Sequence, residues 1–293
     1  MPYNYSYAKM NSSMNEEQEL EQFNEDHPHP DVVGIESLFK FSKFDGNKIE
    51  HIEDLFVKGK LYTSIPKHFN DPFECKPNFI WPNNPSKVQR IRKHLIKVAI
   101  KHGHKRKSAE ALISKNMSKP GFLNEIIYNS LQHTYSETRI CSLTTNKENL
   151  LFWSHYADSH RGFCVEYNST VLPISYAFKV QYKDEYPTLI YPSPPSSLGL
   201  KPVLIKSKSW EYEEEYRIVF VPEAQRAPKN DGEFLILSGN EIKNVYLGVG
   251  MGEENKRILI DLITKGPFNP RIWDVSLSKS SFKLMFNERN KVD

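Results

Sequence analysis

The chain has 293 residues, a formal net charge of +3 at pH 7 and 39% hydrophobic side chains, including 17 Phe, 15 Tyr and 4 Trp. This small net charge does not indicate nucleic-acid binding by the chain as a whole, and the large aromatic side chains are sufficient to build a core. Three cysteines without a CxxC spacing argue against a disulfide framework or a zinc knuckle. No apolar run approaches the roughly 18 residues of a membrane span, and no signal-peptide pattern opens the chain. We therefore expect a cytoplasmic protein.

Residues 1–30 are polar and end in His27-Pro-His29-Pro. Such a composition buries too little apolar area to order itself, so this segment is predicted to be a flexible tail. Two nearby histidines can bind a metal, but histidines in such a tail are more often simply solvated. Residues 31–293 are expected to form a single domain.

The first structured elements are expected between residues 35 and 65. Residues 35–41 indicate a strand that carries Lys40 among apolar neighbours. Apolar residues then recur at helical spacing over 49–56, and residues 61–65 indicate a second strand. This part of the chain supports an α+β fold.

A polar turn follows at Asn70-Asp71-Pro72, where the proline keeps Asp71 extended. The side chains of Asn70 and Asp71 either close the turn on the backbone or face a ligand. The same segment contains Glu74 and Lys76, a Glu-x-Lys pattern similar to that of metal-dependent nucleases. There, Asp71 and Glu74 would bind Mg²⁺.

A basic segment covers residues 87–107, with nine Lys or Arg and no Asp or Glu. It is predicted to form a basic amphipathic helix, whose charged face either binds the phosphates of a nucleic acid or is only solvated. Further helical patterns at 109–117 and 122–134 predict a helical insertion over about 83–135. The apolar positions of the basic helix share one face: Val88, Ile91, Leu95 and Val98.

An aromatic-rich segment, 150–156, contains Trp153, His155 and Tyr156. These side chains can stack on a planar ligand and hydrogen-bond to it, or they can be core aromatics with one satisfied histidine. The fold class predicted from the full pattern is α+β, with a mixed or antiparallel sheet and a helical insertion. Further strands are expected at 139–143, 163–167, 178–182, 219–221, 234–237, 245–249, 271–276 and 282–286.

The proline-rich residues 187–202 are predicted to form a long loop, which leads to an acidic stretch ending in Arg217. If a strand covers this stretch, Glu213, Glu215 and Arg217 share one face. Charged groups on a buried face are costly unless they pair or do chemistry. The stretch is therefore either an ion-pair cluster or a site. Later, the glycines of 248–252 precede a predicted helix over 253–265 and could cradle a phosphate there.

Several of these pieces together resemble a large, mostly bacterial family known only as domain of unknown function 2971. The resemblance covers about residues 35–250 and implies no activity by itself. The matching pieces are Leu38-Phe-Lys-Phe41, Leu61-Tyr-Thr-Ser64, Phe69-Asn-Asp-Pro-Phe-Glu74, Cys141-Ser-Leu143, Phe152-Trp-Ser-His-Tyr156, His160-Arg-Gly162, Trp210-Glu-Tyr-Glu-Glu-Glu-Tyr-Arg217 and Tyr246-Leu-Gly248.

A second resemblance is to the ADP-ribosyltransferase fold, which includes DNA-modifying toxins. It implies a split sheet, NAD as a substrate and transfer to a macromolecule, in a toxin or phage-defence role. Glu215 stands at the catalytic-glutamate position, with Glu213 two residues before it, and Lys40 stands where those enzymes carry a His or Arg. Other positions implied to bind NAD are Tyr62 and Ser64, on a second strand that reads Tyr62-Thr-Ser64, and Trp153 and Tyr156 in the aromatic segment.

The chemistry implied is stabilisation of an oxocarbenium-like transition state by a carboxylate, while Lys40 or Arg217 holds the pyrophosphate. We extend the expected site to Asn70, Asp71 and His155. Two alternatives remain open: a non-catalytic ligand-binding or sensor module, and a Mg²⁺-dependent nuclease. In a transferase, Lys40, Trp153 or Tyr156, and Glu215 would meet at one cleft.

Overall fold

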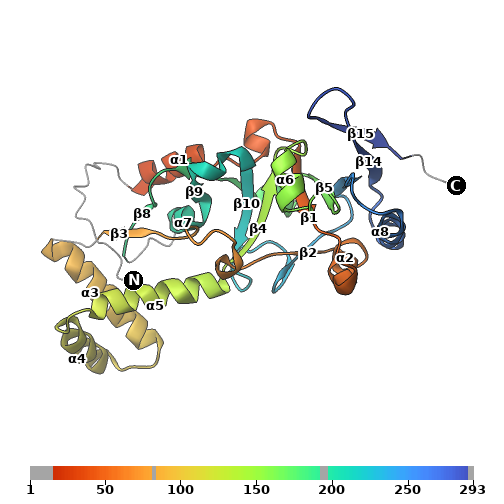
Figure 1. Cartoon of the computed structure of the whole chain (residues 1–293). Helices are drawn as coiled ribbons and strands as arrows, with labels where there is room; N and C mark the ends of the chain where they lie inside the picture. Colours follow the sequence, from red (N-terminus) through yellow and green to blue (C-terminus); the bar gives the residue numbers. More distant parts are fainter. Residues whose placement is uncertain (1–15, 81–83, 192–196, 290–293) are drawn as a thin grey trace.

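A computed structural model describes residues 16–80, 84–191 and 197–289. Its centre is an eight-stranded sheet with the order β15-β14-β13-β5-β1-β4-β10-β6. Figure 1 labels β15, β14, β5, β1, β4 and β10 of this sheet. Strands β13 and β14 run parallel, and the other neighbours run antiparallel. The predicted α+β class with a mixed, mostly antiparallel sheet is therefore confirmed. The strands are β1 Ser37–Ser42, β4 Arg139–Thr144, β5 Phe163–Asn168, β6 Phe178–Lys179, β10 Glu215–Phe220, β13 Ile242–Leu247, β14 Arg271–Leu277 and β15 Leu284–Glu288.

The sheet has a weak seam between β1 and β4. Strand β1 pairs with β5 over six residues, and β4 pairs with β10 over six. Between β1 and β4, only Phe39 and Thr144 are in register. Beyond this pair the two strands have no registered partners, and side chains of both strands line a cavity at this seam.

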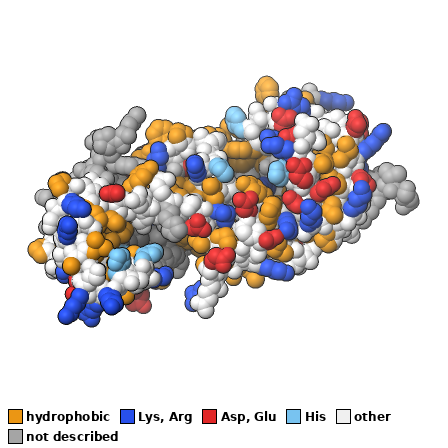
Figure 2. Space-filling view, turned by 90° about the horizontal axis from the view of Figure 1, so that it is seen from below, with side chains coloured by type: hydrophobic (Ala, Val, Ile, Leu, Met, Phe, Trp, Pro, Cys, Tyr) orange, Lys and Arg blue, Asp and Glu red, His pale blue; other side chains and the backbone are white. Residues whose placement is uncertain are grey.

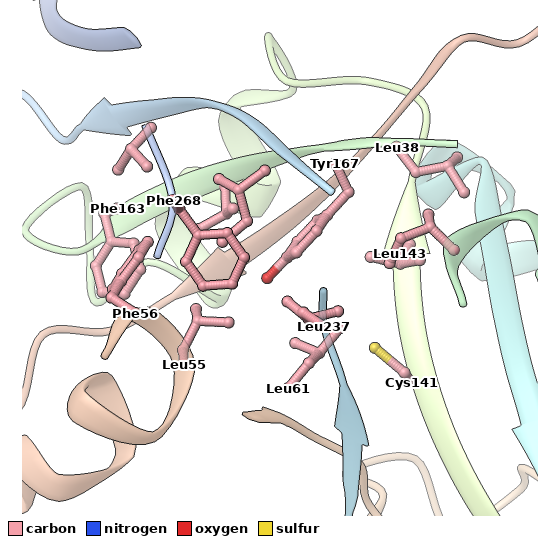
Figure 3. Close-up of a cluster of buried hydrophobic side chains, with 14 of the residues drawn as sticks. Leu38, Leu55, Phe56, Leu61, Cys141, Leu143, Phe163, Tyr167, Leu237 and Phe268 are labelled. Atoms are coloured by element: carbon pink, nitrogen blue, oxygen red, sulfur yellow. The ribbon is translucent and has the colours of Figure 1, made fainter. Parts of the chain in front are cut away.

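One face of the sheet is covered by α2 (Ile49–Phe56) and α8 (Glu253–Lys265). Side chains alternate along each strand, so β10 sends Tyr216, Ile218 and Phe220 into this layer. Figure 3 shows Phe56 of α2 among side chains of the sheet, including Tyr167. Fully burying each large apolar side chain contributes about 1.5–3 kcal/mol. This layer is the main core.

The opposite face carries a second apolar cluster under α6 (Leu150–His155). Asn149 caps α6, because its side-chain oxygen accepts from the backbone N–H groups of Leu151 and Phe152. Phe41 of β1 lies against Trp153 with ring centroids 5.1 Å apart. The cap and this aromatic contact fix α6 beside the seam.

The predicted helical insertion consists of α3 (Pro85–Lys101), α4 (Arg106–Met117) and α5 (Phe122–Glu137), which project to the lower left in Figure 1. The basic helix expected over 87–107 is corrected: α3 ends at Lys101, and residues 106 and 107 belong to α4. Gly103, with φ of +91°, lies between them in a conformation that favours glycine.

The prediction that residues 1–30 form a flexible tail is wrong for residues 16–30, which are ordered against the rest of the protein. Residues 16–26 form α1 (Glu16–Asp26), and Phe23 is only 1% exposed. The ring nitrogen Nδ1 of His27 lies 2.8 Å from the carbonyl oxygen of Lys179, on edge strand β6. Burial lowers the pKa of His27. Residues 1–15 lie outside the described residues.

The long loop predicted over 187–202 is also corrected. It contains β8 (Thr188–Ile190) and leads through a 3-10 turn, Ser197–Leu200, into α7 (Lys201–Leu204), while residues 192–196 lie outside the described part. The strand expected over 178–182 divides into β6 and β7, which belong to different sheets. Smaller sheets pair β3 (Asn78–Ile80) with β8, β7 (Gln181–Lys183) with β9 (Ile205–Ser207), and β12 (Phe234–Ile236) with β2 (Lys60–Tyr62) and β11 (Asn230–Asp231). Further 3-10 turns are Asp31–Val33, Gly46–Lys48, Pro66–His68, Ile174–Tyr176 and Lys208–Glu213.

Of the glycines at 248–252, Gly248 is required by close backbone packing. A Cβ on Gly248 would lie 2.2 Å from the backbone oxygen of His160. Helix α8 begins with Glu253 and Glu254, whose charges oppose an anion at that terminus. The expected phosphate cradle is therefore not supported. Among the described residues, no helix combines the length and apolar character that crossing a membrane requires.

Candidate functional site

A cavity of about 430 Å³ lies at the seam between β1 and β4. Its volume falls within the range of small-molecule sites. Aromatic rings and charged groups both contribute to its wall. The lining residues are Phe39, Lys40, Phe41, His68, Phe69, Asn70, Glu74, Ser142, Leu143, Phe152, His155, Tyr156, Lys206, Glu213, Glu215 and Arg217.

The guanidinium of Arg217 organises one side of the cavity, with only 1% of its side chain exposed. Its Nε and Nη2 atoms donate to the two carboxylate oxygens of Glu215 at 2.7 and 2.8 Å, and Nη2 also donates to Glu74. Nη1 donates to the Val203 carbonyl at 2.8 Å. The Phe69 ring lies over the guanidinium, with its centroid 5.2 Å from the Arg217 Cζ atom. This bidentate, fully buried arrangement suits arginine and would not suit lysine.

Lys206 is the second buried cation. Its Nζ lies 3.1 Å from Glu74, 2.5 Å from Glu213 and 3.4 Å from Glu215, and 4.9 Å from the Trp210 ring centroid. Burial alone would lower the pKa of the Lys206 ammonium, but the surrounding glutamates outweigh it and raise that pKa. Three carboxylates therefore face two cations, which leaves one excess negative charge when all five groups are ionised.

Glu213 joins this network to the aromatic wall. The Tyr156 hydroxyl donates to Glu213 Oε1 at 2.7 Å and accepts a hydrogen bond from Asn70. Burial raises the pKa of Glu213, although Lys206 opposes the shift. A carboxyl with a raised pKa at a cavity is a candidate for proton transfer.

The side chains of Glu213 and Glu215 point to the same cavity, but not because they alternate along one strand, as the sequence predicted. Glu213 ends the 3-10 turn before β10, and Glu215 is the first residue of β10. Between them, Glu214 has φ of +45°, in the left-handed region. This local turn, instead of strand alternation, directs both side chains to the same cavity.

Glu215 is held ionised. Burial alone would raise the pKa of Glu215, but Arg217 and Lys206 outweigh burial and lower it to about 2. Its backbone N–H donates to the Tyr182 hydroxyl at 2.8 Å. Glu215 thus provides a fixed negative charge over the whole physiological pH range.

This depressed pKa predicts a pH-dependent stability difference between the wild type and Glu215→Gln. Ionised Glu215 stabilises the folded state above its ordinary pKa of 4.5, and this contribution disappears as the pH falls toward about 2. Urea unfolding at a series of pH values should show the free-energy gap shrinking by about 3 kcal/mol over this interval. Glu254→Gln, at an exposed position, should show no such change. A pH-independent gap for Glu215→Gln would contradict the prediction.

Lys40 lies across the seam from this network. Its Nζ donates to the Ser142 carbonyl at 3.2 Å. An ammonium has three donors, so Lys40 can also bind an anionic group of a ligand. Of the residues predicted for the site, seven line the cavity: Lys40, Asn70, His155, Tyr156, Glu213, Glu215 and Arg217.

Trp153 has a structural position instead of the expected ligand-stacking one. Its side chain is fully buried beneath α6, and its Nε1 donates to the Lys147 carbonyl at 2.8 Å. It belongs to the second apolar cluster and is not among the cavity-lining residues. Phe39 and Phe41 line the cavity above it. The stacking role expected for Trp153 is therefore corrected.

Three other predicted residues also lie outside the cavity lining. Tyr62 is 43% exposed on β2 and packs edge-on against Phe234. Ser64 pairs through its backbone with β4. Asp71 accepts from Trp210 Nε1 at 2.7 Å and closes its own turn by accepting from a backbone N–H. For Asp71, the turn-closing alternative is the observed one.

Lys206 and Glu74 are central residues that the sequence reasoning missed or assigned otherwise. Lys206 directly follows the short apolar run Val203-Leu-Ile205, and this run is the signal that could have placed a buried segment there. For Glu74, the sequence pattern predicts only a metal-ligand role. Its carboxylate instead pairs with Arg217 and Lys206. Within the described ranges, no group of three or more His, Cys, Asp or Glu side chains is arranged to hold a metal.

Comparisons with protein-family models, curated proteins and solved structures give no match.

Proposed function

We propose that this protein is an ADP-ribosyltransferase-like enzyme, which uses NAD⁺ as a substrate and transfers ADP-ribose to a macromolecule. The observation that supports this most is the meeting of Lys40, Tyr156 and Glu215 at one cavity. On the side of the cavity formed by Glu74, Glu213, Glu215, Lys206 and Arg217, three carboxylates face two cations. With all five groups ionised, the one excess negative charge favours a cationic group such as the nicotinamide ring of NAD⁺. Lys40 on the other side of the seam supplies a cation for the pyrophosphate.

In this mechanism, the bond between nicotinamide and the ribose carbon breaks, and its electron pair leaves with nicotinamide. Positive charge develops on the ribose, where the fixed carboxylate of Glu215 stabilises it. An oxygen or nitrogen of the target forms the new bond to the same carbon. Its proton passes to Glu213, whose raised pKa suits a proton acceptor.

The sheet geometry supports the same proposal. A seam with one registered residue pair between β1 and β4 fits the split sheet that the ADP-ribosyltransferase resemblance implies. In this interpretation β1 supplies Lys40, and β10 begins with the catalytic glutamate, as in that fold. The two halves of the sheet then hold opposite ends of the substrate.

The experiment is an NAD⁺ turnover assay with the whole chain. Purified protein is incubated with NAD⁺ labelled in the adenylate half, and with DNA, RNA or bacterial lysate. The expected result is nicotinamide release together with label on a macromolecule. Growth arrest on expression would add support for a toxin or defence role. If the protein neither binds nor turns over NAD⁺, the proposal is overturned.

A non-catalytic ligand-binding module is the second candidate, because every glutamate of the network is paired. Glu215 is bound by Arg217, and Glu213 by Lys206 and Tyr156. Saturable NAD⁺ binding without nicotinamide release would favour this candidate. The nuclease alternative loses support, because Asp71 and Glu74 face different partners.

A further inference from the structure

The helical insertion has a charge opposite to that of the rest of the chain. Residues 87–107 contain nine Lys or Arg and no Asp or Glu, while the whole chain has a net charge of +3, so the remaining residues have a net charge of −6. Figure 2 shows blue Lys and Arg side chains at the lower left of the molecule, and Figure 1 places α3 and α4 at the left end. Positive potential is therefore concentrated on this arm.

The arm presents its lysines in a fixed direction. Ile91 and Leu95 are buried against α4, so this side of α3 is fixed. Lys93, Lys97 and Lys101 are exposed and four residues apart. This spacing places them along one helix face, about 6 Å from one to the next. They form a stripe of cations that we call the lysine stripe.

We propose that the lysine stripe binds the phosphate backbone of a double-stranded nucleic acid, which makes nucleic acid the macromolecule presented to the cavity. The second part rests on the proposed function. Residues 85–107 contain no Phe, Tyr or Trp, whereas single-strand platforms stack bases on aromatic rings. Lysines without aromatics suit contacts to duplex phosphates.

The arm follows and precedes cavity-lining residues along the chain. Strand β3 begins four residues after Glu74 and leads into α3. Helix α5 leads back into β4, which supplies Ser142 to the cavity wall. A duplex held on the arm is therefore bound to an element anchored at both ends beside the cavity.

The test is binding of a fluorescein-labelled 20-base-pair DNA duplex, measured by anisotropy at several salt concentrations without NAD⁺. The wild type should bind with a Kd of roughly 10⁻⁴–10⁻⁶ M at physiological salt, the range of sequence-independent binding, and more tightly at low salt. The triple variant Lys93→Gln, Lys97→Gln and Lys101→Gln should bind about tenfold or more weakly. Its slope of log affinity against log salt should be smaller by about 2–3.

The matched control replaces three exposed lysines elsewhere, Lys48, Lys279 and Lys283, with glutamine. It should bind the duplex as the wild type does; an equal loss in this control would overturn the proposal. Equally tight, stripe-dependent binding of polyglutamate or of phosphatidylserine vesicles would also overturn it, in favour of an acidic protein or a membrane. Because the duplex assay omits NAD⁺, failed duplex binding and failed NAD⁺ turnover are separate results.

Discussion

Replacing Glu215 with glutamine should lower NAD⁺ turnover about 100- to 1,000-fold, the usual cost of losing one electrostatic stabiliser of a transition state. Glutamine keeps the size of the side chain and removes its negative charge. The measurement is nicotinamide release under saturating NAD⁺, on protein shown by circular dichroism to be folded at the assay temperature.

The neighbouring residue provides a matched control. Glu214 is exposed and accepts a hydrogen bond from the Thr145 hydroxyl at 2.6 Å, away from the cavity-lining residues. Glu214→Gln should therefore retain wild-type turnover. Equal rates for the wild type and Glu215→Gln would exclude Glu215 as the catalytic carboxylate. A matching loss in Glu214→Gln would show that the effect is not specific to the site.

Replacing Arg217 with methionine should destabilise the protein by about 3–5 kcal/mol, because removing one member of a buried ion pair leaves its partner uncompensated. Glu74 and Glu215 would then share only Lys206 as a cation. Such a loss is a large part of the 5–15 kcal/mol that typically separates folded from unfolded domains. Urea unfolding at neutral pH measures it.

Arg161→Met is the comparison for this prediction. Arg161 forms an ion pair with Asp158 at 3.0 Å, but its side chain is 61% exposed. Its loss should cost no more than about 1 kcal/mol. Adding Glu215→Gln to Arg217→Met should recover part of the lost stability, because it removes one unpaired charge. Similar costs for Arg217→Met and Arg161→Met would show that the buried network contributes little.

The elements nearest the site could be predicted from the sequence because their local patterns agree with their environment. Strands β1, β4 and β10 contain apolar runs, and the apolar residues of α2 recur at helical spacing. The charged residues Glu213, Glu215 and Arg217 stood out because charges beside buried strands are costly without a partner. The residue types at this site were thus informative by themselves.

The partners of these charges could not be predicted, because they come from distant parts of the chain. Nothing local indicates that Glu74 meets Arg217, 143 residues away. Lys206 was hidden by the proline-rich segment before it, which composition assigned to a loop. Trp153 was misassigned because an indole has the same local sequence signal whether it faces a ligand or fills a core. Only the tertiary contacts distinguish these cases.

The single registered pair between β1 and β4 has a mechanical consequence. In most sheets, separating two neighbouring strands means breaking a full ladder of backbone hydrogen bonds. Here, the strands can move apart by a hinge-like rotation about Phe39 and Thr144 while both six-residue ladders on either side stay intact. We therefore expect the entrance to the cavity to open and close at this seam more readily than it would between two strands joined by a full ladder.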